Sequence, residues 1–512
     1  MKRLLTIRPC NQFIKRSVLL LFLFLSIFSY SFSDHNSIIY LKSIDIETLD
    51  PGETTDSYST EVIFNIYEGL VRFVKNSTKI EGCLAKSWIV KDNGKRWIFK
   101  LRKDVKFHNG EDFNAKAVEI NFKTRLKNKD KYQNWNLAYA YLDHVRAIDE
   151  FTVEFILKIP YIPFLYSLAN AKSMIVAPSS YTGRIFKPVG TGPFIYSEWR
   201  KDKYVTIVRN TVYWDSVPKI SKVVFKIVKD AAWRFLQMKT GKAELAFVKS
   251  GHEYEEIRGH REIKIISVPS ITIHSLGFNI RKKPFNDIRV RQAFSHMINK
   301  EKLIKHVFQN FAGDASTPLP PHIFGFNDRI KNYRFDIKKA GKLLREAGYE
   351  KGFKVSLYYS INSSNLKTIA IAFKRAAKKL KINIIMKPLP FDELRAAINK
   401  GIHDMVMIGW AGDIPDPDVF LYNTFTLKKG HLNRTGYNNP ELTKIIDKAR
   451  STVDMDKRKS LYFKAQEIIY RDIPLIPLFN LNDLFIYNKK VKNVYVNRLS
   501  ILIFKDMYLE DN

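Results

Sequence analysis

The segment between residues 287 and 408 alternates between helical and strand-like spacing of apolar residues, and this alternation constrains the fold more than any other feature. Asp287 precedes the first helical pattern as a candidate cap, and Gly348 stands where a helix end favours a left-handed residue. The patterns in chain order are helical at 290–298, helical at 336–347, strand-like at 354–359, helical at 366–380 and strand-like at 382–386. Strands that alternate with helices predict βαβ units and an α/β fold.

The chain before about residue 275 is richer in strand patterns, and a β-hairpin is predicted at 87–101. The Asn-Gly pair at 93–94 supplies the positive φ of a tight turn, and alternate residues over 97–101 are apolar. We therefore expect two lobes of different character, with a last strand-like run at 494–504 returning to the first lobe.

The N-terminal residues predict export. A leader with five basic residues precedes an apolar run at 18–28, which at about a dozen residues is shorter than the roughly 20 needed to span a bilayer. Small residues at Ser31 and Ser33 predict cleavage before Asp34. Residues 1–33 are thus expected to be a cleaved signal peptide, and the mature protein is expected in the periplasm.

The formal net charge is +34 at pH 7, a basic excess that can serve nucleic acid, an anionic membrane or an acidic ligand. The lysines are scattered along the chain, and no dense arginine and aromatic stripe appears, so nucleic-acid binding is not expected. Of the two cysteines, only Cys83 lies beyond the leader, which predicts no intrachain disulfide in the mature chain.

Motifs that would indicate an enzyme are missing from the sequence. There is no Walker phosphate loop, no complete Gly-x-Gly-x-x-Gly, no Gly-x-Ser-x-Gly and no Cys-x-x-Cys. The run at 252–256 opens like a zinc-protease motif but lacks its second histidine, and the histidines show no ligand spacing. We expect no catalytic residue, no metal site and no cofactor.

An acidic cluster, Asp413, Asp416 and Asp418, follows the strand-like run at 404–408. A strand that ends in Gly-Trp-Ala-Gly-Asp places small residues and a carboxylate at its C-terminal edge, where ligands commonly bind in α/β sheets. Asp416 and Asp418 are expected to cap turns around the neighbouring prolines. For Asp413 two interpretations remain open, a turn cap or a carboxylate that meets a cationic group against Trp410.

Several segments together resemble the extracytoplasmic solute-binding proteins of peptide ABC transporters, family 5, over nearly the whole chain beyond the leader. They are Thr-Leu-Asp-Pro at 48–51, Asn-Ile-Tyr-Glu-Gly-Leu-Val at 65–71, the run at 84–108, Pro-Val-Gly-Thr-Gly-Pro-Phe at 188–194, Phe-Asn at 278–279, Pro-Phe at 284–285, Val-Arg-Gln-Ala at 290–293, and the run from Gly-Trp to Phe at 409–420. Their order and spacing, rather than any one of them, carry the resemblance.

The resemblance implies a two-lobed periplasmic binding protein of type II, a Venus-flytrap fold with an extra subdomain in the first lobe. The expected first lobe comprises 34–276 and a C-terminal return at 483–512, and the second comprises 277–482. Two crossovers are expected, near 275–279 and 478–484. In this family the lobes close on the ligand about a hinge.

The resemblance also implies six ligand-binding residues, which are Asp413, Trp410, Ala411, Gly412, Thr54 and Thr55. Asp413 matches the aspartate that pairs with the α-ammonium of a peptide, and the three residues before it match the stretch that lines the ligand backbone. The threonines lie where members contact ligand from the first lobe.

The sequence departs from the family at one anchor. Dipeptide receptors place an arginine in the loop that corresponds to 360–365, and this loop contains none. Lys367 is a candidate substitute, although its flexible ammonium is a poorer bidentate partner for a carboxylate than a guanidinium. A strict dipeptide preference is therefore not expected.

Taken with the resemblance, the sequence predicts a monomeric substrate-binding protein that delivers peptides to an inner-membrane ABC permease and its ATPase subunits. A nickel chelate, haem, a murein peptide or an antimicrobial peptide are alternative ligands, because only the pocket distinguishes them. An exported hydrolase and a basic periplasmic chaperone are the alternatives from other classes.

Overall fold

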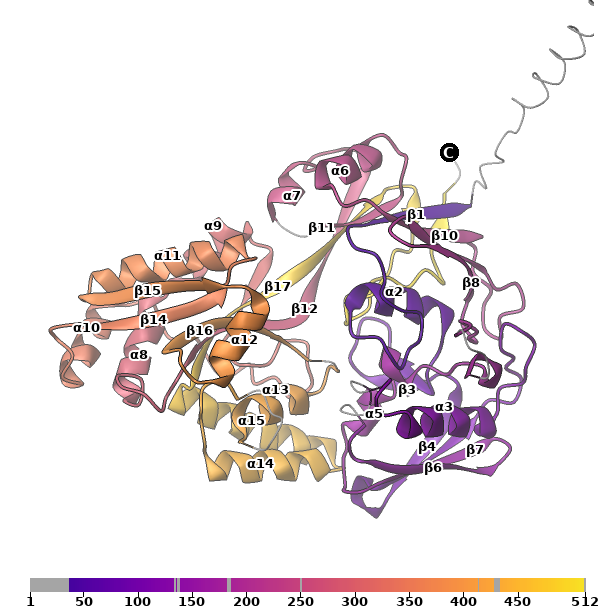
Figure 1. Ribbon diagram of the computed structural model, residues 1–512, viewed down its shortest axis with the longest axis horizontal. Helices are drawn as coiled ribbons and strands as arrows, with labels where there is room; N and C mark the ends of the chain where they lie inside the picture. The colour runs from indigo at the N-terminus through magenta and orange to yellow at the C-terminus, as the bar shows by residue number, and fades with distance from the viewer. Residues whose placement is uncertain are drawn as a thin grey trace, which may run out of the picture.

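The computed structural model describes residues 36–132, 135, 139–181, 186–248, 251–412, 414–427 and 433–510. The predicted signal peptide, 1–33, lies outside the described residues. Two α/β lobes lie side by side, and β12 (Ile263–Phe278) and β17 (Leu475–Asn488) run from one to the other (Figure 1). Within the described ranges, no helix has both the length and the apolar character to cross a membrane.

One sheet continues through both lobes, in the order β15-β14-β16-β12-β17-β11-β1-β10-β9-β8, with β13 beside β17. The bounds in the first lobe are β1 (Ser37–Lys42), β8 (Phe194–Arg200), β9 (Tyr204–Arg209), β10 (Lys222–Ile227) and β11 (Leu245–Val248), and those in the second are β13 (Ala312–Asp314), β14 (Phe353–Ser360), β15 (Ile382–Leu389) and β16 (Met405–Ala411).

The two long strands pair antiparallel along both lobes, with a register shift between Pro269 and Ile273. On one side of the shift they continue the sheet of the first lobe through β11, and on the other side they continue that of the second through β16. The crossovers expected near 275–279 and 478–484 overlap these strands.

The second lobe contains the predicted βαβ unit, because β14 and β15 pair in parallel and are connected by α11 (Ser364–Lys378). The predicted cap at Asp287 is confirmed, since its side chain accepts from the amide of Arg289. Asp336, where the second helical pattern was expected to begin, is also a cap and accepts from the amide of Lys339. The helices of this lobe are α8 (Ile288–Met297), α9 (Lys300–Phe308), α10 (Ile337–Glu346), α11 (Ser364–Lys378), α12 (Phe391–Asn399), α13 (Pro417–Phe425), α14 (Pro440–Ser451) and α15 (Met455–Asp472).

The first lobe carries an extra subdomain built on a separate antiparallel sheet, in the order β4-β5-β7-β6. The predicted hairpin is confirmed as its first two strands, and Asn93 and Gly94 have φ of 53° and 94° at the turn. The bounds are β4 (Ala85–Lys91), β5 (Arg96–Leu101), β6 (Leu142–Asp149), β7 (Thr152–Leu157) and α3 (Ala115–Lys127). Trp97 and Phe122 lie in the core between this sheet and α3.

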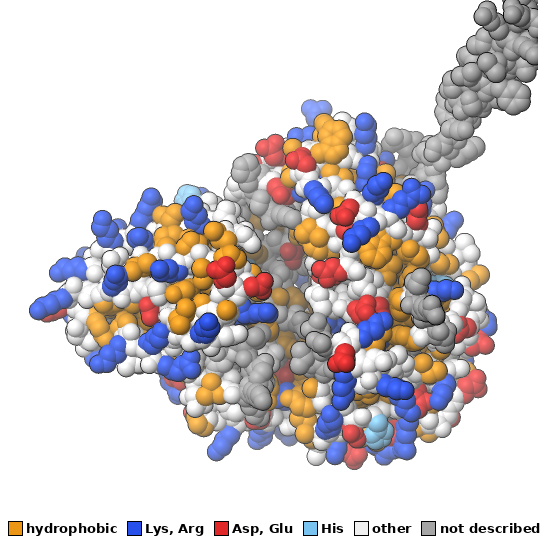
Figure 2. All heavy atoms as spheres, viewed as in Figure 1, with side chains coloured by type: hydrophobic (Ala, Val, Ile, Leu, Met, Phe, Trp, Pro, Cys, Tyr) orange, Lys and Arg blue, Asp and Glu red, His pale blue; other side chains and the backbone are white. Residues whose placement is uncertain are grey.

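The remaining elements of the first lobe are smaller. They are α2 (Ser57–Ile66), β2 (Val71–Phe73), β3 (Ile80–Gly82), α5 (Phe164–Ser167), α6 (Ala231–Lys239), α7 (Gly251–Glu255), β18 (Val491–Lys492) and β19 (Tyr508–Leu509). Figure 2 shows lysine and arginine side chains spread over both lobes on the face in view.

The strand predicted at 494–504 was wrong. Only a single bridge, Val496 to Leu502, forms there, because the Asn497 side chain accepts from the amides of Leu499 and Ile501 and holds the chain in a turn. Leu502 and its neighbours nevertheless pack into the core of the first lobe.

The motif at 188–194 has a packing explanation. A Cβ at Gly190 would lie 2.2 Å from the carbonyl oxygen of Ile66, and one at Gly192 would lie 2.5 Å from the same atom. The amide of Gly192 donates to that oxygen over 3.0 Å. The two glycines let this loop approach the end of α2 closely.

Candidate functional site

The C-terminal ends of β14, β15 and β16 lie at one edge of the second lobe, because β14 pairs in parallel with both neighbours. β16 extends to Ala411, so the predicted placement of the Gly-Trp-Ala stretch at the C-terminal edge of a strand is confirmed. Gly409 lies opposite His274, and Trp410 opposite Ile273, on the long strand β12. The candidate site therefore begins beside the strand that joins the lobes.

Trp410 is half-buried against α13. Its indole N–H donates to the carbonyl of Val419 over 3.1 Å, so this polar group is already used within the fold. The guanidinium carbon of Arg434 lies 5.7 Å from the centre of its ring. Ala411, the next residue, is exposed.

Gly412 lies where the chain turns from β16 toward α13. A Cβ there would lie 2.6 Å from Cγ2 of Val419 and 2.7 Å from the ring of Phe420, so a larger residue would push the turn away from the helix. Asp413, the predicted ammonium anchor, lies outside the described residues.

The two predicted threonines lie on the other lobe, just before α2. Thr54 is buried, and its hydroxyl donates to the carbonyl of Asp56 over 3.4 Å. The hydroxyl oxygens of Thr54 and Thr60 lie 3.3 Å apart. Thr55 is exposed. Of this pair, Thr55 has the side chain that is open to solvent.

The loop at 360–365 connects β14 to α11. Ser363 caps the helix by accepting from the amide of Leu366 over 3.2 Å. Lys367, considered above as a substitute for the missing arginine, is exposed on the first turn of the helix.

Asp416 caps α13 as predicted, since its side chain accepts from the amide of Asp418 over 2.9 Å. It also forms two hydrogen bonds of 2.8 Å with Arg458, and both side chains are fully buried. The sequence around Asp416 does not reveal this ion pair, because Arg458 lies 42 residues further along the chain.

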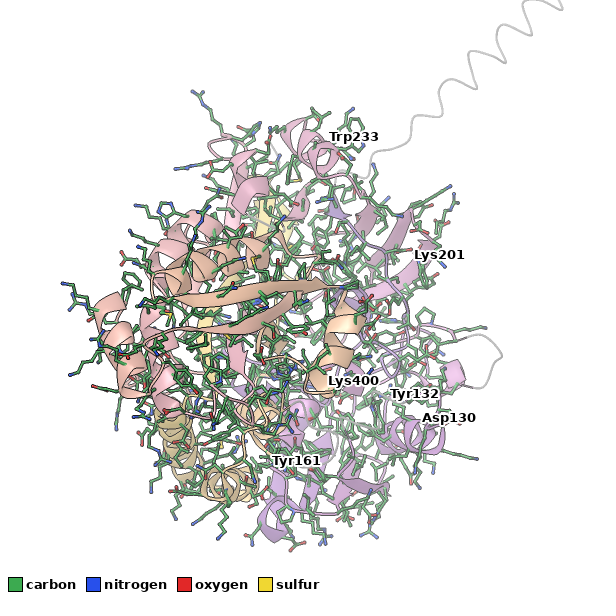
Figure 3. All side chains as sticks on the ribbon, turned by 60° about the vertical axis from the view of Figure 1, so that its left-hand side comes forward. Asp130, Tyr132, Tyr161, Lys201, Trp233 and Lys400 are labelled. Carbon is green, nitrogen blue, oxygen red and sulfur yellow. The ribbon has the colours of Figure 1, made fainter. Side chains whose placement is uncertain are left out.

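The expectation that Asp418 caps a turn was wrong, because Asp416 already occupies the cap position. Oδ2 of Asp418 instead accepts from the hydroxyl of Tyr161 in the first lobe over 3.0 Å. Oδ1 lies 2.7 Å from Nε of Arg450. Figure 3 shows Tyr161 where the first lobe meets the helices of the second.

Arg450 completes this contact between the lobes. Its guanidinium carbon lies 3.4 Å from the centre of the Tyr422 ring, and Nη2 donates to the hydroxyl of Tyr141 over 3.1 Å. Its carbonyl accepts from the amide of Ile162 over 2.8 Å. Burial raises the pKa of Asp418 to about 6, although the positive charge of Arg450 opposes the shift.

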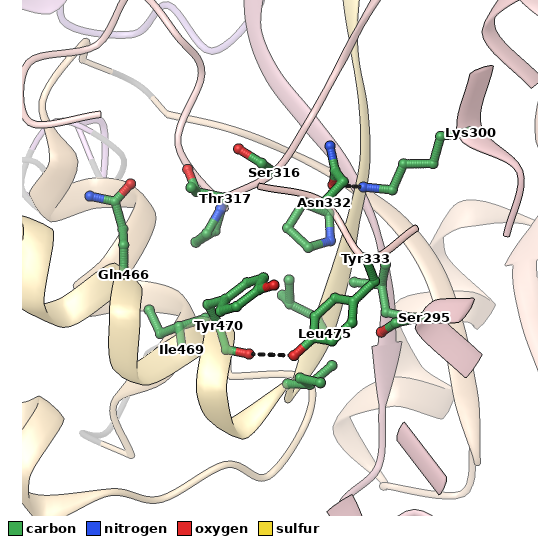
Figure 4. Close-up of a pocket in the computed structure, with 14 residues that line it drawn as sticks. Ser295, Lys300, Ser316, Thr317, Asn332, Tyr333, Gln466, Ile469, Tyr470 and Leu475 are labelled. Atoms are coloured by element: carbon green, nitrogen blue, oxygen red, sulfur yellow. Dashed lines mark hydrogen bonds between the residues drawn. The ribbon is translucent and has the colours of Figure 1, made fainter. Parts of the chain in front are cut away.

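A small cavity lies deeper in the second lobe, beside β17 (Figure 4). Nζ of Lys300 donates to the carbonyl of Ala315 over 2.6 Å, and burial lowers the pKa of this lysine to about 8. The Tyr333 hydroxyl donates to the carbonyl of Tyr470 over 3.4 Å. The cavity volume is about 30 Å³, which suits a water molecule and is far too small for a peptide.

Sequence reasoning missed Arg434, Arg450 and Tyr161. Each contributes through a contact with a residue far away or on the other lobe, and neither periodicity nor a short motif marks such a contact. No cluster of three or more His, Cys, Asp or Glu with the geometry of a metal site occurs among the residues that the structure describes.

Comparisons with known proteins agree with the fold. The model of "Bacterial extracellular solute-binding proteins, family 5 Middle" matches residues 79–431. Heme-binding protein A of Haemophilus influenzae is 30% identical over 81% of this chain and 81% of its own, and the dipeptide-binding protein of Escherichia coli is 28% identical over 90% and 91%.

Among solved structures, the periplasmic binding protein DppA of Helicobacter pylori in complex with peptide STSA is 30% identical, with a TM-score of 0.76 over 93% of this chain and 98% of that one. These matches confirm the predicted family and the two-lobed fold. The chain belongs to the bacterial extracellular solute-binding proteins of family 5.

Proposed function

We propose that this chain is an exported receptor that captures peptides in the periplasm and delivers them to the permease of an ABC importer. The single observation that carries this proposal is the likeness to the Helicobacter pylori protein, which was solved with a bound peptide and matches nearly the whole chain. The likeness to a dipeptide-binding protein supports the same ligand class.

In this proposal the ligand lies between the end of β16 and the first lobe, with its α-ammonium on Asp413. An ionised carboxylate that is buried without a partner costs several kcal/mol, so an empty site stays hydrated and a ligand ammonium favours closure. Ala411 is exposed for the peptide and the buried Gly412 keeps the turn close to α13, while Thr55 faces the ligand from the first lobe.

Two features of the structure support closure about β12 and β17. The register shift between Pro269 and Ile273 interrupts the pairing of these strands where the lobes join. The contact of Tyr161 with Asp418 and of Tyr141 with Arg450 is made by side chains that separate when the lobes move apart.

Asp413→Asn is expected to weaken the binding of a peptide with a free amino terminus by roughly 10- to 100-fold, because a charge-assisted hydrogen bond contributes about 1.5–3 kcal/mol. Binding of the same peptide after N-acetylation should change little. Isothermal titration calorimetry of both peptides measures the effect. Asp130→Asn, at an exposed position of the first lobe, is the matched control. Equal affinities of wild type and Asp413→Asn for the free-amine peptide would contradict the anchor.

Native mass spectrometry of the protein purified from its own host tests the ligand class. We expect adducts with the masses of short peptides, which disappear when the protein is unfolded and refolded without ligand. Adducts with the mass of haem or of a metal chelate would overturn the peptide proposal and leave the family assignment intact.

A further inference from the structure

A cavity of about 320 Å³ lies in the second lobe, between α12 and the turn at 433–434. Its walls are partly apolar, through residues of α12 and Ile408 of β16. Three guanidinium groups and two carboxamides, but no carboxylate, are found among the described residues that line it. These polar residues are Arg281, Arg395, Arg434, Asn399 and Asn433. The cavity thus has the charge of a site for an anion.

Arg434 is the most deeply placed of the three arginines, and the only half-buried one; Arg281 and Arg395 are exposed. Its guanidinium forms no hydrogen bond or ion pair with any residue that the structure describes, and its recorded contact is the face of Trp410. Burial lowers the pKa of Arg434 to about 10, and no carboxylate among the described residues opposes the shift. A half-buried cation that has lost part of its hydration gains from an anion, so an external anion would be stabilising here.

Arg281 reaches the same cavity across two glycines. A Cβ at Gly436 would lie 2.5 Å from Nε of Arg281, and one at Gly401 would lie 3.2 Å from Nη2. Both glycines have positive φ, 68° and 64°, which other residues adopt with strain. The guanidinium of Arg281 therefore packs directly against the backbone of these glycines, and a side chain at Gly436 would displace the guanidinium.

Arg395 contributes a weaker charge to the cavity. It lies on α12, and the nearest recorded carboxylate, Asp392, is 3.9 Å away with both side chains exposed. Such a solvated pair neutralises little of its charge. The described residues that line this cavity therefore carry an excess of positive charge.

The cavity adjoins the candidate ligand edge. Ile408 and Arg434 also line a smaller cavity that includes Trp410 and Ser275. The first residue of α12, Phe391, follows β15 at the edge where β16 also ends.

We propose that this cavity is an anion subsite that binds a carboxylate of the captured ligand, with Arg434 and Arg281 as its ligands. The proposal rests on the proposed function for the nature of the ligand. The carboxylate belongs either to the C-terminus of a short peptide or to an acidic side chain near its amino terminus.

Competition between peptides tests the subsite and distinguishes the two sources of carboxylate. Three pools of tripeptides are offered to the ligand-stripped protein: free acids without acidic residues, the same peptides with C-terminal amides, and amides that contain one Glu. Native mass spectrometry reads the fraction of each pool retained. We expect a carboxylate to raise retention by about 10- to 100-fold over the neutral amides, and Arg434→Met to abolish this preference.

Arg434→Lys is expected to keep part of the preference, because lysine retains the charge but loses the bidentate geometry. Arg375→Met, at an exposed position of α11, is the matched control and should behave as wild type. Preference for free acids identifies a C-terminal carboxylate, and preference for the Glu amides identifies a side chain.

A second measurement reads the subsite without any peptide. The thermal midpoint of the ligand-stripped protein is followed as acetate replaces chloride at constant ionic strength, and a saturable rise is expected in wild type and Arg375→Met but not in Arg434→Met. Retention of peptides without preference for a carboxylate, in wild type and Arg434→Met alike, overturns the subsite while the proposed function stands. If no peptide is retained, the result counts against the proposed function. The acetate measurement then decides the subsite alone, and an equal rise of the thermal midpoint in wild type and Arg434→Met overturns it.

Discussion

Arg458→Met is expected to lower the free energy of unfolding by about 3–5 kcal/mol, because it leaves the carboxylate of Asp416 buried and without a cation. Arg458 donates to both oxygens of Asp416 over 2.8 Å, and neither side chain is exposed. Its Nε also donates to the carbonyl of Ala449 over 3.1 Å, and Nη2 to the hydroxyl of Tyr462 over 3.1 Å. The pair thereby joins α13, α14 and α15.

The double variant Asp416→Leu/Arg458→Met separates the cost of a stranded charge from the value of the pair. It should regain most of the loss, since hydrophobic replacement of a buried pair is often neutral, but about 1 kcal/mol should remain missing because α13 loses its cap. Lys457→Met, one residue away on the exposed face of α15, should stay within about 0.5 kcal/mol of wild type. Urea denaturation followed by circular dichroism measures all three. Stability of Arg458→Met within about 1 kcal/mol of wild type would show that Asp416 finds another partner or water.

Local features of both lobes were predictable from the sequence. Asp287 and Asp336 cap helices because an aspartate next to an amphipathic pattern can bind the free amides of the first turn, and both partners lie within three residues. The turn at Asn93 and Gly94 was likewise predictable, because few residues adopt its backbone angles readily. In each case the chemistry that determines the structure lies within a few residues of the motif.

The other features depend on contacts through space. Asp418 resembles a turn residue in sequence, and its role follows only from Tyr161, which lies 257 residues away on the other lobe. Arg434 lies on a turn without periodicity, so nothing local indicates that its guanidinium lies over Trp410. The apolar residues at 494–504 are spaced like a strand, but side-chain hydrogen bonds of Asn497 compete with strand pairing there.

The stability of the contact between the lobes is expected to depend on pH, because Asp418 titrates there. Burial, together with the negative charge of Asp416, raises the pKa of Asp418 to about 6 from 3.8, against the attraction of Arg450 and Arg458. Among the described residues, the hydroxyl of Tyr161 and the guanidinium of Arg450 are the side-chain groups that contact the carboxylate. Because the pKa is raised when the site is buried, the contact is most stable below pH 3.8 and loses stability as the pH rises through about 6.

The ligand-free protein is therefore expected to open as the pH rises from 5 to 8, because separation of the lobes gives the ionised Asp418 access to water. A shift from 3.8 to about 6 corresponds to at most about 3 kcal/mol between the separated and closed arrangements, at 1.36 kcal/mol for each pH unit. About 1.4 kcal/mol of this falls between pH 5 and 8, because only the last pH unit below the raised pKa lies in that range. Small-angle X-ray scattering should record a larger radius of gyration at pH 8 than at pH 5. Asp418→Asn should remove this difference, since the amide does not titrate but can still accept from Tyr161, whereas Asp456→Asn, at an exposed position of α15, should preserve it. A radius of gyration that is constant with pH in wild type, or equally dependent on pH in Asp418→Asn, would exclude Asp418 as the group that couples protonation to the contact between the lobes.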